Sequence, residues 1–413
     1  MTATPDSIYS RRLQGSIYGT AFFTGNLFPM SHVVMPLWAA IELDASLSMV
    51  GLIIASRQVL PITISIHGGA LLDRFGPRRV IMVLGVLGAL STAMVPFLPF
   101  IWATILLQIF IGFCETTNWI GVQSAVGTLM KGKAIYAGRM TASARIGGMV
   151  GLLIVGSAYD AGGAVGGFLC FGAWAFCGVI AAFFLPVHEK THGTGTPDSA
   201  ARQDRTDVLP SLGDYRETFR LLLIPAVALV IAATFMRQTG SGVQASFYAV
   251  WLKELGYTAT TISLLIAISN GVSAASALTI GPLTRRIADY WLLIMAISLA
   301  VLGITATPLL EGFFVFAVAI SLRGVGQGLN LPLMMSIASR AVAPRLQGRV
   351  AALRISFNRL GGALFPLIMG VLADHVGLDN AFYIIGATGI VLICGLSVWV
   401  ARAKDQLEDR PSH

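Results

Sequence analysis

Residues 69–97 read GALLDRFGPRRVIMVLGVLGALSTAMVPF, a short charged segment that passes directly into a long apolar one. The first part holds Asp73 and three arginines, whereas no charged residue occurs between Val80 and Phe97. An uninterrupted apolar run of about 18 residues or more is long enough to cross the hydrocarbon core of a bilayer as an α-helix. The stretch therefore predicts a membrane-spanning helix with a charged connection at one end.

Long apolar runs and short polar breaks alternate along the chain on both sides of this stretch. Of the 413 residues, 55% are hydrophobic and 12% are charged, and soluble domains have about twice that charged fraction. We therefore expect an all-α membrane protein with twelve spans rather than a soluble fold. The predicted spans are 15–42, 47–72, 79–97, 100–127, 140–160, 163–186, 220–252, 259–284, 288–308, 312–340, 350–373 and 380–402.

The connections between the spans differ in charge on the two sides of the membrane. With the N-terminus inside the cell, the inner connections contain Arg74, Arg78, Arg79, Lys131, Lys133, Arg139, Arg285, Arg286, Arg340, Arg345 and Arg349. The outer connections contain one basic residue, Lys253, and otherwise Glu42, Asp44, Asp160, Glu254, Glu311, Asp374 and Asp379. The positive-inside rule predicts that both termini are cytoplasmic. We expect the membrane to be the inner membrane of a bacterium.

The two ends of the chain repeat one another around a polar centre. Residues 187–219 are too polar to cross a membrane, so we expect a cytoplasmic linker between a six-helix bundle at 1–186 and another at 220–413. The pattern LDASLSMVGLIIAS at 43–56 returns as LGYTATTISLLIAIS at 255–269, and Arg-Ile-Gly-Gly at Arg145 returns as Arg-Leu-Gly-Gly at Arg359. In this register Asp160 corresponds to Asp374.

The charged segment also follows the pattern of a known signature: Gly69, then Asp73 followed by Arg74, then Gly76 and a basic pair that begins at Arg78. It resembles the signature between helices two and three of the major facilitator superfamily, and the resemblance extends over the whole chain. The resemblance implies a secondary transporter with two pseudo-symmetric halves of six helices, commonly a monomer, that works by alternating access. It also implies that Asp73, Arg74 and Arg78 form a gating cluster.

The chain departs from the superfamily's patterns in three places. The matching connection of the second half, GPLTRR at 281–286, keeps the basic pair but lacks the acid, so it gives no support for a second gating cluster. Helix four has Gln108 where many members have an arginine, and Arg323 takes the corresponding place in helix ten. Helix five lacks the Gly-Pro motif of proton-driven drug exporters, which weighs against a drug antiporter.

Other functional classes find no support in the sequence. The net charge of +8 and the pI near 9.6 would suit a nucleic-acid-binding protein only if the basic residues lay on a soluble domain, and none is predicted. The four cysteines lie in apolar segments without the spacing of metal ligands. No nucleotide-binding loop or Ser/His/Asp arrangement occurs, so we expect no enzyme, no cofactor, no metal site and no nucleic-acid partner.

Arginines within the spans give the strongest indication of the substrate. Facing Arg57, Arg145, Arg237, Arg323, Arg354 and Arg359 all to lipid would cost on the order of 18 kcal/mol, at roughly 3 kcal/mol each. Most must therefore face other helices or a wet cavity, although Arg354 is close enough to a helix end to snorkel. Because Glu115 is the only acid inside a span and away from its ends, we expect the excess positive charge to bind an organic anion.

Helical spacing groups several polar residues on shared faces. Arg237 and Gln244 lie on one face of helix seven, as do Arg323 and Gln327 on helix ten. The residues expected to contact the solute are Arg57, Trp119, Arg145, Arg237, Gln244, Arg323, Gln327, Asn330, Asn358 and Arg359. For Arg145 and Arg359, hydrogen bonds to helix-end carbonyls within one half remain the alternative. Trp38 and Trp251 are assigned to the interfacial aromatic belt.

Glu115 and His32 are the candidates for proton coupling, because buried groups of these types change charge when their surroundings change. A structural role remains open for both: Glu115 paired with Arg57 or Arg145, and His32 held by a hydrogen bond. The function expected from the sequence is secondary transport of a small organic anion, such as a carboxylate, an organic phosphate or a carboxylate siderophore, by proton coupling or exchange. The alternative is a proton-driven exporter of drugs or metabolites with a broad apolar cavity.

Overall fold

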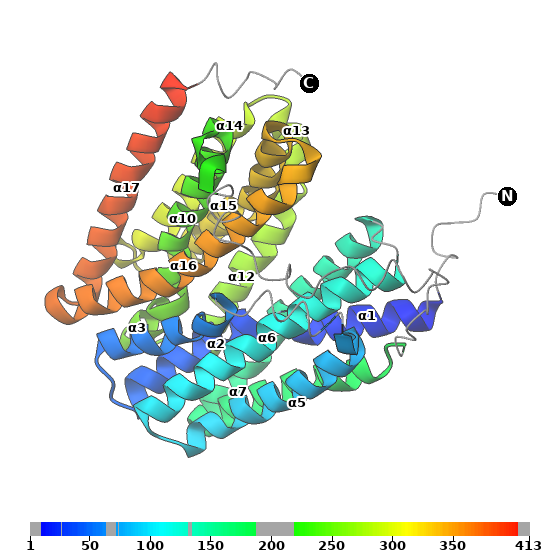
Figure 1. Cartoon of the computed structure of the whole chain (residues 1–413). Coiled ribbons are helices and arrows are strands. Elements are labelled where there is room, and N and C mark those ends of the chain that lie inside the picture. The colour runs from blue at the N-terminus through cyan, green and yellow to red at the C-terminus, as the bar shows by residue number, and fades with distance from the viewer. Residues whose placement is uncertain are drawn as a thin grey trace, which may run out of the picture.

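A computed structural model describes residues 10–25, 27–62, 72, 74–130, 134–186 and 219–403, and contains no β-strand in these ranges (Figure 1). The first half contains α1 (Arg11–Thr24), α2 (Leu27–Leu37), a π-helical turn (Trp38–Glu42), α3 (Leu47–Ser56), α5 (Pro77–Met94), a 3₁₀ turn (Val95–Phe97), α6 (Ile101–Leu129) and α7 (Ala134–Phe183). The second contains 3₁₀ turns (Leu221–Leu223 and Thr307–Leu309), α10 (Pro225–Ser246), α11 (Tyr248–Glu254), α12 (Ala259–Ala277), α13 (Ile280–Thr284), α14 (Asp289–Thr305), α15 (Phe313–Ala341), α16 (Pro344–Val376) and α17 (Leu378–Arg402).

Within the described residues these helices form twelve successive segments, as the sequence predicts. α1 and α2 together form the first segment, and α10 and α11 the seventh. α7 supplies two segments, because its backbone leaves the helical conformation at Gly162 and Gly163. Gly163 has a φ of 59°, a left-handed conformation that favours glycine. Asp73, Lys131, Lys133 and residues 187–218 of the predicted linker lie outside the described residues.

The two halves pack against each other at one end and diverge toward the other (Figure 1). α3 of the first half packs on α16 of the second, and α7 packs on α12. Glycines permit these close approaches: a Cβ atom at Gly51 would lie 2.3 Å from the Pro366 carbonyl oxygen, and one at Gly156 would lie 2.7 Å from that of Ala259. We call this end, where α3 meets α16 and α7 meets α12, the joined end.

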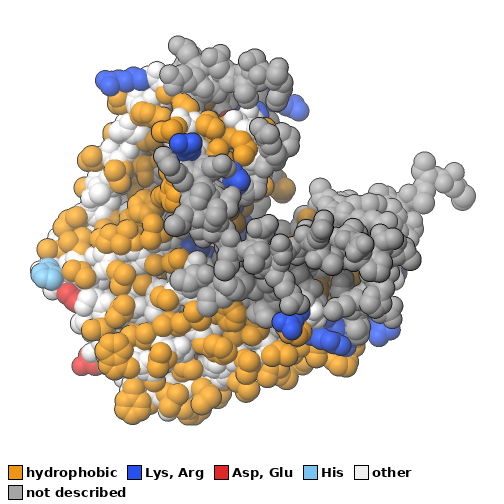
Figure 2. Space-filling model, in the orientation of Figure 1, with side chains coloured by type: hydrophobic (Ala, Val, Ile, Leu, Met, Phe, Trp, Pro, Cys, Tyr) orange, Lys and Arg blue, Asp and Glu red, His pale blue; other side chains and the backbone are white. Residues whose placement is uncertain are grey.

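The outer surface has the character expected of a protein in a bilayer. Large apolar side chains are widely exposed, among them Trp102 at 71%, Phe314 at 82% and Val391 at 70%. Such a surface would be unfavourable in water but suits lipid. On the visible face, basic side chains lie toward the end of the molecule where the termini emerge, and acidic side chains lie at the opposite end (Figure 2).

The assignment of Trp38 and Trp251 to an interfacial belt is wrong. Their exposed fractions are only 3% and 5%. Trp38 packs edge-on against Phe168. Trp251 packs edge-on against Phe316 and donates a hydrogen bond of 2.6 Å to Asp379 Oδ1. Both rings belong to the hydrophobic core at the joined end, because the helices that carry them lie between the other helices rather than at the lipid surface.

Candidate functional site

A cavity of about 350 Å³ lies between the two halves. α2 and α7 line it from the first half, and α10, α12, α15 and α16 line it from the second. It brings together seven residues expected from the sequence to contact the solute: Arg145, Arg237, Gln244, Arg323, Gln327, Asn330 and Asn358. His32 and Arg354 also line it. The helical stripes of the second half therefore face a common space.

Arg237 is held in the cavity by neutral groups. Its Nη1 donates a hydrogen bond of 2.8 Å to Gln327 Oε1, and its Nη2 donates to Asn358 Oδ1. Gln327 in turn donates from Nε2 to Ser241 Oγ at 2.9 Å, so that its amide is fixed in this orientation. Because amides and hydroxyls bring no formal charge, the guanidinium remains an uncompensated cation.

Arg323 is similar but more deeply enclosed, with an exposed fraction of 5%. Its Nη1 donates a hydrogen bond of 3.2 Å to Ser269 Oγ of α12. Arg237 lines the same cavity, so the like charges of the two guanidiniums repel each other. No Asp or Glu occurs among the described residues that line the cavity, so nothing in its walls offsets the four guanidinium charges.

Several polar atoms of the lining have no hydrogen-bond partner within the described protein. They are Nε of Arg237 and of Arg323, Nε2 of Gln244 and of His32, and both side-chain polar atoms of Asn330. Buried polar groups normally find a partner. These atoms can therefore donate to and accept from a bound molecule, and the donors outnumber the acceptors.

A second polar cluster, formed by Arg57, Glu115 and Gln108, lies beside the cavity, and in it the charge of the arginine is compensated. Arg57 forms an ion pair with Glu115, and its Nη1 donates a hydrogen bond of 2.9 Å to Gln108 Oε1. All three residues are buried. The ring of Phe28 lies 5.8 Å from the Arg57 guanidinium and 4.6 Å from the ring of His32, which connects this cluster to the edge of the cavity.

Arg57, Trp119 and Arg359 do not line the cavity. Arg57 lies in the compensated cluster, where Glu115 is its partner. Trp119 is half-buried among side chains of α1 and α7. Arg359 donates from Nη1 to Gln58 Oε1 at 3.0 Å, a hydrogen bond that joins the two halves. Helical spacing could place these residues on faces but could not say which neighbour each face would meet.

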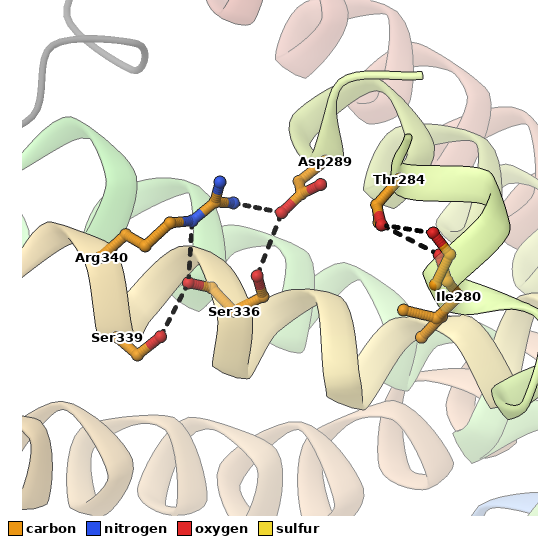
Figure 3. A network of polar contacts seen from close by, with 7 residues as sticks. Ile280, Thr284, Asp289, Ser336, Ser339 and Arg340 are labelled. Atoms are coloured by element: carbon orange, nitrogen blue, oxygen red, sulfur yellow. Dashed lines mark hydrogen bonds and ion pairs between the residues drawn. The ribbon is translucent and has the colours of Figure 1, made fainter. Parts of the chain in front are cut away.

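The predicted gating arginines lie at the end opposite the joined end. The Arg74 guanidinium lies 5.3 Å from the ring centre of Phe75, and that of Arg78 lies 5.1 Å from Phe183. In the second half, the connection at 281–286 lacks the acid of the signature, but an acid lies a few residues after it. Asp289, in the first turn of α14, accepts a hydrogen bond of 3.1 Å from Ser336 and pairs with Arg340 of α15 (Figure 3).

The internal repeat matches Asp160 with Asp374 but predicts no contact for either residue. In the structure, each of them contacts the opposite half. Asp374 accepts hydrogen bonds from the backbone N–H groups of Leu47 (2.8 Å) and Ser48 (3.0 Å), at the start of α3. Asp160 accepts from those of Ala259 (2.8 Å) and Thr260 (2.7 Å), at the start of α12. Each carboxylate thus caps a helix N-terminus of the other half, where unpaired N–H groups and the helix dipole favour an anion.

Comparison with known proteins agrees with this architecture. The family model described as Major Facilitator Superfamily matches residues 17–236 and 230–412. Multidrug resistance protein MdtG of Rahnella sp. (strain Y9602) is 24% identical, over 97% of this chain and 96% of the relative. MdtG of Salmonella typhi is 23% identical over 94% of each chain.

Solved structures share the fold. The nucleoside transporter NupG has a TM-score of 0.73 at 14% identity, over 94% of this chain and 98% of that chain. A bacterial homolog of the human lysosomal transporter Spinster, in an inward-facing and unoccupied conformation, has a TM-score of 0.71 at 15% identity, over 98% of this chain and 100% of that chain. The family match, the twelve helical segments and the cavity between two halves lead to one conclusion: the chain is a multi-pass membrane transporter, not an enzyme, and belongs to the Major Facilitator Superfamily.

Proposed function

We propose that this transporter moves a small organic anion through the cavity between its halves. One observation carries the proposal: Arg145, Arg237, Arg323 and Arg354 line the cavity, and no described acidic side chain lines it with them. Solvent is partly excluded from such a site, which strengthens the attraction between a guanidinium and an anion. Carboxylates, organic phosphates and carboxylate siderophores match the planar fork of a guanidinium, and lipophilic cations would be repelled.

Alternating access would require the joined end to open. The caps formed by Asp160 and Asp374 are the contacts between halves that must then break, together with the hydrogen bond from Arg359 to Gln58. We place the joined end outside a bacterial inner membrane and both termini in the cytoplasm, because the acidic connections belong to the joined end and the basic ones to the opposite end. The division into bundles at 1–186 and 220–413, acting as a monomer, belongs to the same proposal.

Glu115 and His32 are our candidates for coupling to protons. Protonation of Glu115 would remove the partner of Arg57 and add a fifth uncompensated cation next to the cavity. His32 lies between that cluster and the cavity, with Nε2 unpaired. Both positions would connect proton binding to anion binding electrostatically. Asp73, Arg74 and Arg78 are proposed to stabilise the closed state of the opposite end.

Export of drugs or metabolites is the second candidate, and the relatives favour it. They are named multidrug resistance proteins, and the match extends over nearly the whole of both chains. This supports the exporter alternative better than uptake of a nutrient anion. The lining supports a negatively charged cargo rather than a cation. What the relatives indicate and what the lining indicates agree if the exported compound is an organic acid.

Transport by the purified protein in proteoliposomes tests the choice of cargo. Radiolabelled succinate and citrate should enter vesicles filled with the same unlabelled anion, and the rate should respond to a pH gradient if protons are coupled. Unlabelled organic anions should compete, whereas tetraphenylphosphonium should not. Transport of the lipophilic cation, with no transport of or competition by organic anions, would instead establish the exporter of cationic drugs.

A further inference from the structure

The four cavity arginines are divided unequally between the two halves. Arg145 belongs to α7 of the first half, whereas Arg237, Arg323 and Arg354 belong to α10, α15 and α16 of the second. Arg145 and Arg354 form no hydrogen bond with a described residue, and Arg237 and Arg323 bond only to amides and hydroxyls. Charge on both walls is therefore available to a solute that reaches across the cavity.

A solute with a single anionic group can offset the positive charge of only one wall. If it binds the cluster of the second half, Arg145 stays uncompensated on the opposite wall, and if it binds Arg145, three guanidiniums stay uncompensated. A solute with two anionic groups can offset charge on both walls at once. Each additional charge-assisted hydrogen bond strengthens binding, and a bidentate contact does so with defined geometry.

Closure of the end opposite the joined end would remove the water that solvates these guanidiniums in the open form. Unpaired charges are the groups whose transfer out of water costs the most, and like charges brought together repel more strongly as the water leaves. Glu115 cannot relieve the cost, because it already compensates Arg57. An empty cavity would thus resist closure, and a cavity that holds a dianion would not.

We infer that the cavity takes solutes with at least two negative charges, and that the transporter crosses between its two states only when loaded, so that it exchanges one such anion for another. The inference rests on the proposed function and extends it from organic anions in general to obligate exchange of multiply charged ones. The lining residues that carry it are Arg145 on one wall and Arg237, Arg323 and Arg354 on the other.

Proteoliposomes that contain the full-length protein test both parts. Labelled succinate is offered to vesicles filled with unlabelled succinate and to vesicles filled with buffer alone, in chloride and in gluconate media. We expect uptake by exchange to be about tenfold faster than net uptake, or more. Butyrate, which has the same number of carbon atoms but one charge, should compete roughly 10- to 100-fold more weakly than succinate, in keeping with the loss of one charge-assisted contact.

Arg145→Gln gives a sharper test, because it removes the charge of one wall. This variant should bind butyrate and succinate with more similar affinities and should narrow the difference between exchange and net uptake. Arg402→Gln, at an exposed position at the end of α17, changes the net charge equally and should keep the wild-type behaviour.

The possible failures are distinguishable. If no organic anion moves in any of these vesicles, the proposed function itself is lost. If succinate and butyrate compete equally, or if net uptake in either medium is as fast as exchange, the proposed function stands and the inference is overturned, even where Arg145→Gln fails to fold.

Discussion

Two clusters of buried arginine differ in what compensates their charge. In the first half, Arg57 has both a carboxylate and an amide as partners, from Glu115 and Gln108. In the second half, Arg237, which is only partly buried, has amides only, from Gln327 and Asn358, although it also bonds through Nη1 and Nη2. In a buried ion pair the carboxylate compensates the charge of the guanidinium, whereas neutral amide partners leave that charge uncompensated. We therefore propose that the first cluster stabilises its half and that the second binds the solute.

The largest expected effect comes from removing the carboxylate of the first cluster. Glu115→Gln leaves Arg57 buried and uncompensated, and loss of one partner of a buried pair typically costs about 3–5 kcal/mol. Thermal unfolding of the purified protein in detergent should therefore occur at a clearly lower temperature. The double variant Arg57→Met/Glu115→Leu, which removes both charges, should recover most of the loss. Wild-type stability in Glu115→Gln would contradict the distinction between the clusters.

Removal of a charge from the second cluster should have the opposite effect: transport should be lost and stability retained. Arg237→Gln and Arg323→Gln should abolish transport of succinate while expression and thermal stability stay at or above the wild-type level, because each removes a cation that the fold does not compensate. Binding should weaken by about 10- to 100-fold, the value of a charge-assisted contact. Ligand-induced thermal shifts measure this. Full transport by both variants would mean that these arginines are structural as well.

The smallest effect should come from the two amides that hold the arginines. Gln327→Leu frees Arg237 from a bond of 2.8 Å, so we expect weaker binding by roughly fivefold, consistent with about 1 kcal/mol for one hydrogen bond, and little change in stability. Gln108→Leu removes a bond of 2.9 Å to Arg57 and should lower stability by about 1–2 kcal/mol without a comparable loss of affinity. The same measurements, transport and thermal unfolding, apply to this pair. If Gln327→Leu lowered stability and Gln108→Leu weakened binding instead, the roles assigned to the two clusters would be wrong.

The joined end gives another view of what a carboxylate does in this protein. Asp160 and Asp374 have no arginine partner among their hydrogen bonds and instead accept from backbone N–H groups of the opposite half. Their negative charge interacts with helix N-termini, just as that of Glu115 interacts with Arg57. Glu115, Asp160 and Asp374 are thus engaged in contacts within the protein, whereas no described acid lines the cavity to offset its arginines.

Hydropathy and charge along the chain were enough to predict the membrane environment, the twelve spans and the excess of arginine over acid inside the spans, because these properties need no packing partner. The signature at 69–79 was enough to indicate the family. It also placed Arg237 and Gln244 on one face of a helix, since spacing alone fixes which side chains share a face. Packing between the helices was needed to show that Arg145 faces the cavity while Arg359 contacts Gln58, that Glu115 pairs with Arg57, and that Asp160 and Asp374 cap α12 and α3. The rotation of each helix about its axis, and the neighbour that its polar face meets, depend on packing between segments that lie far apart in the chain.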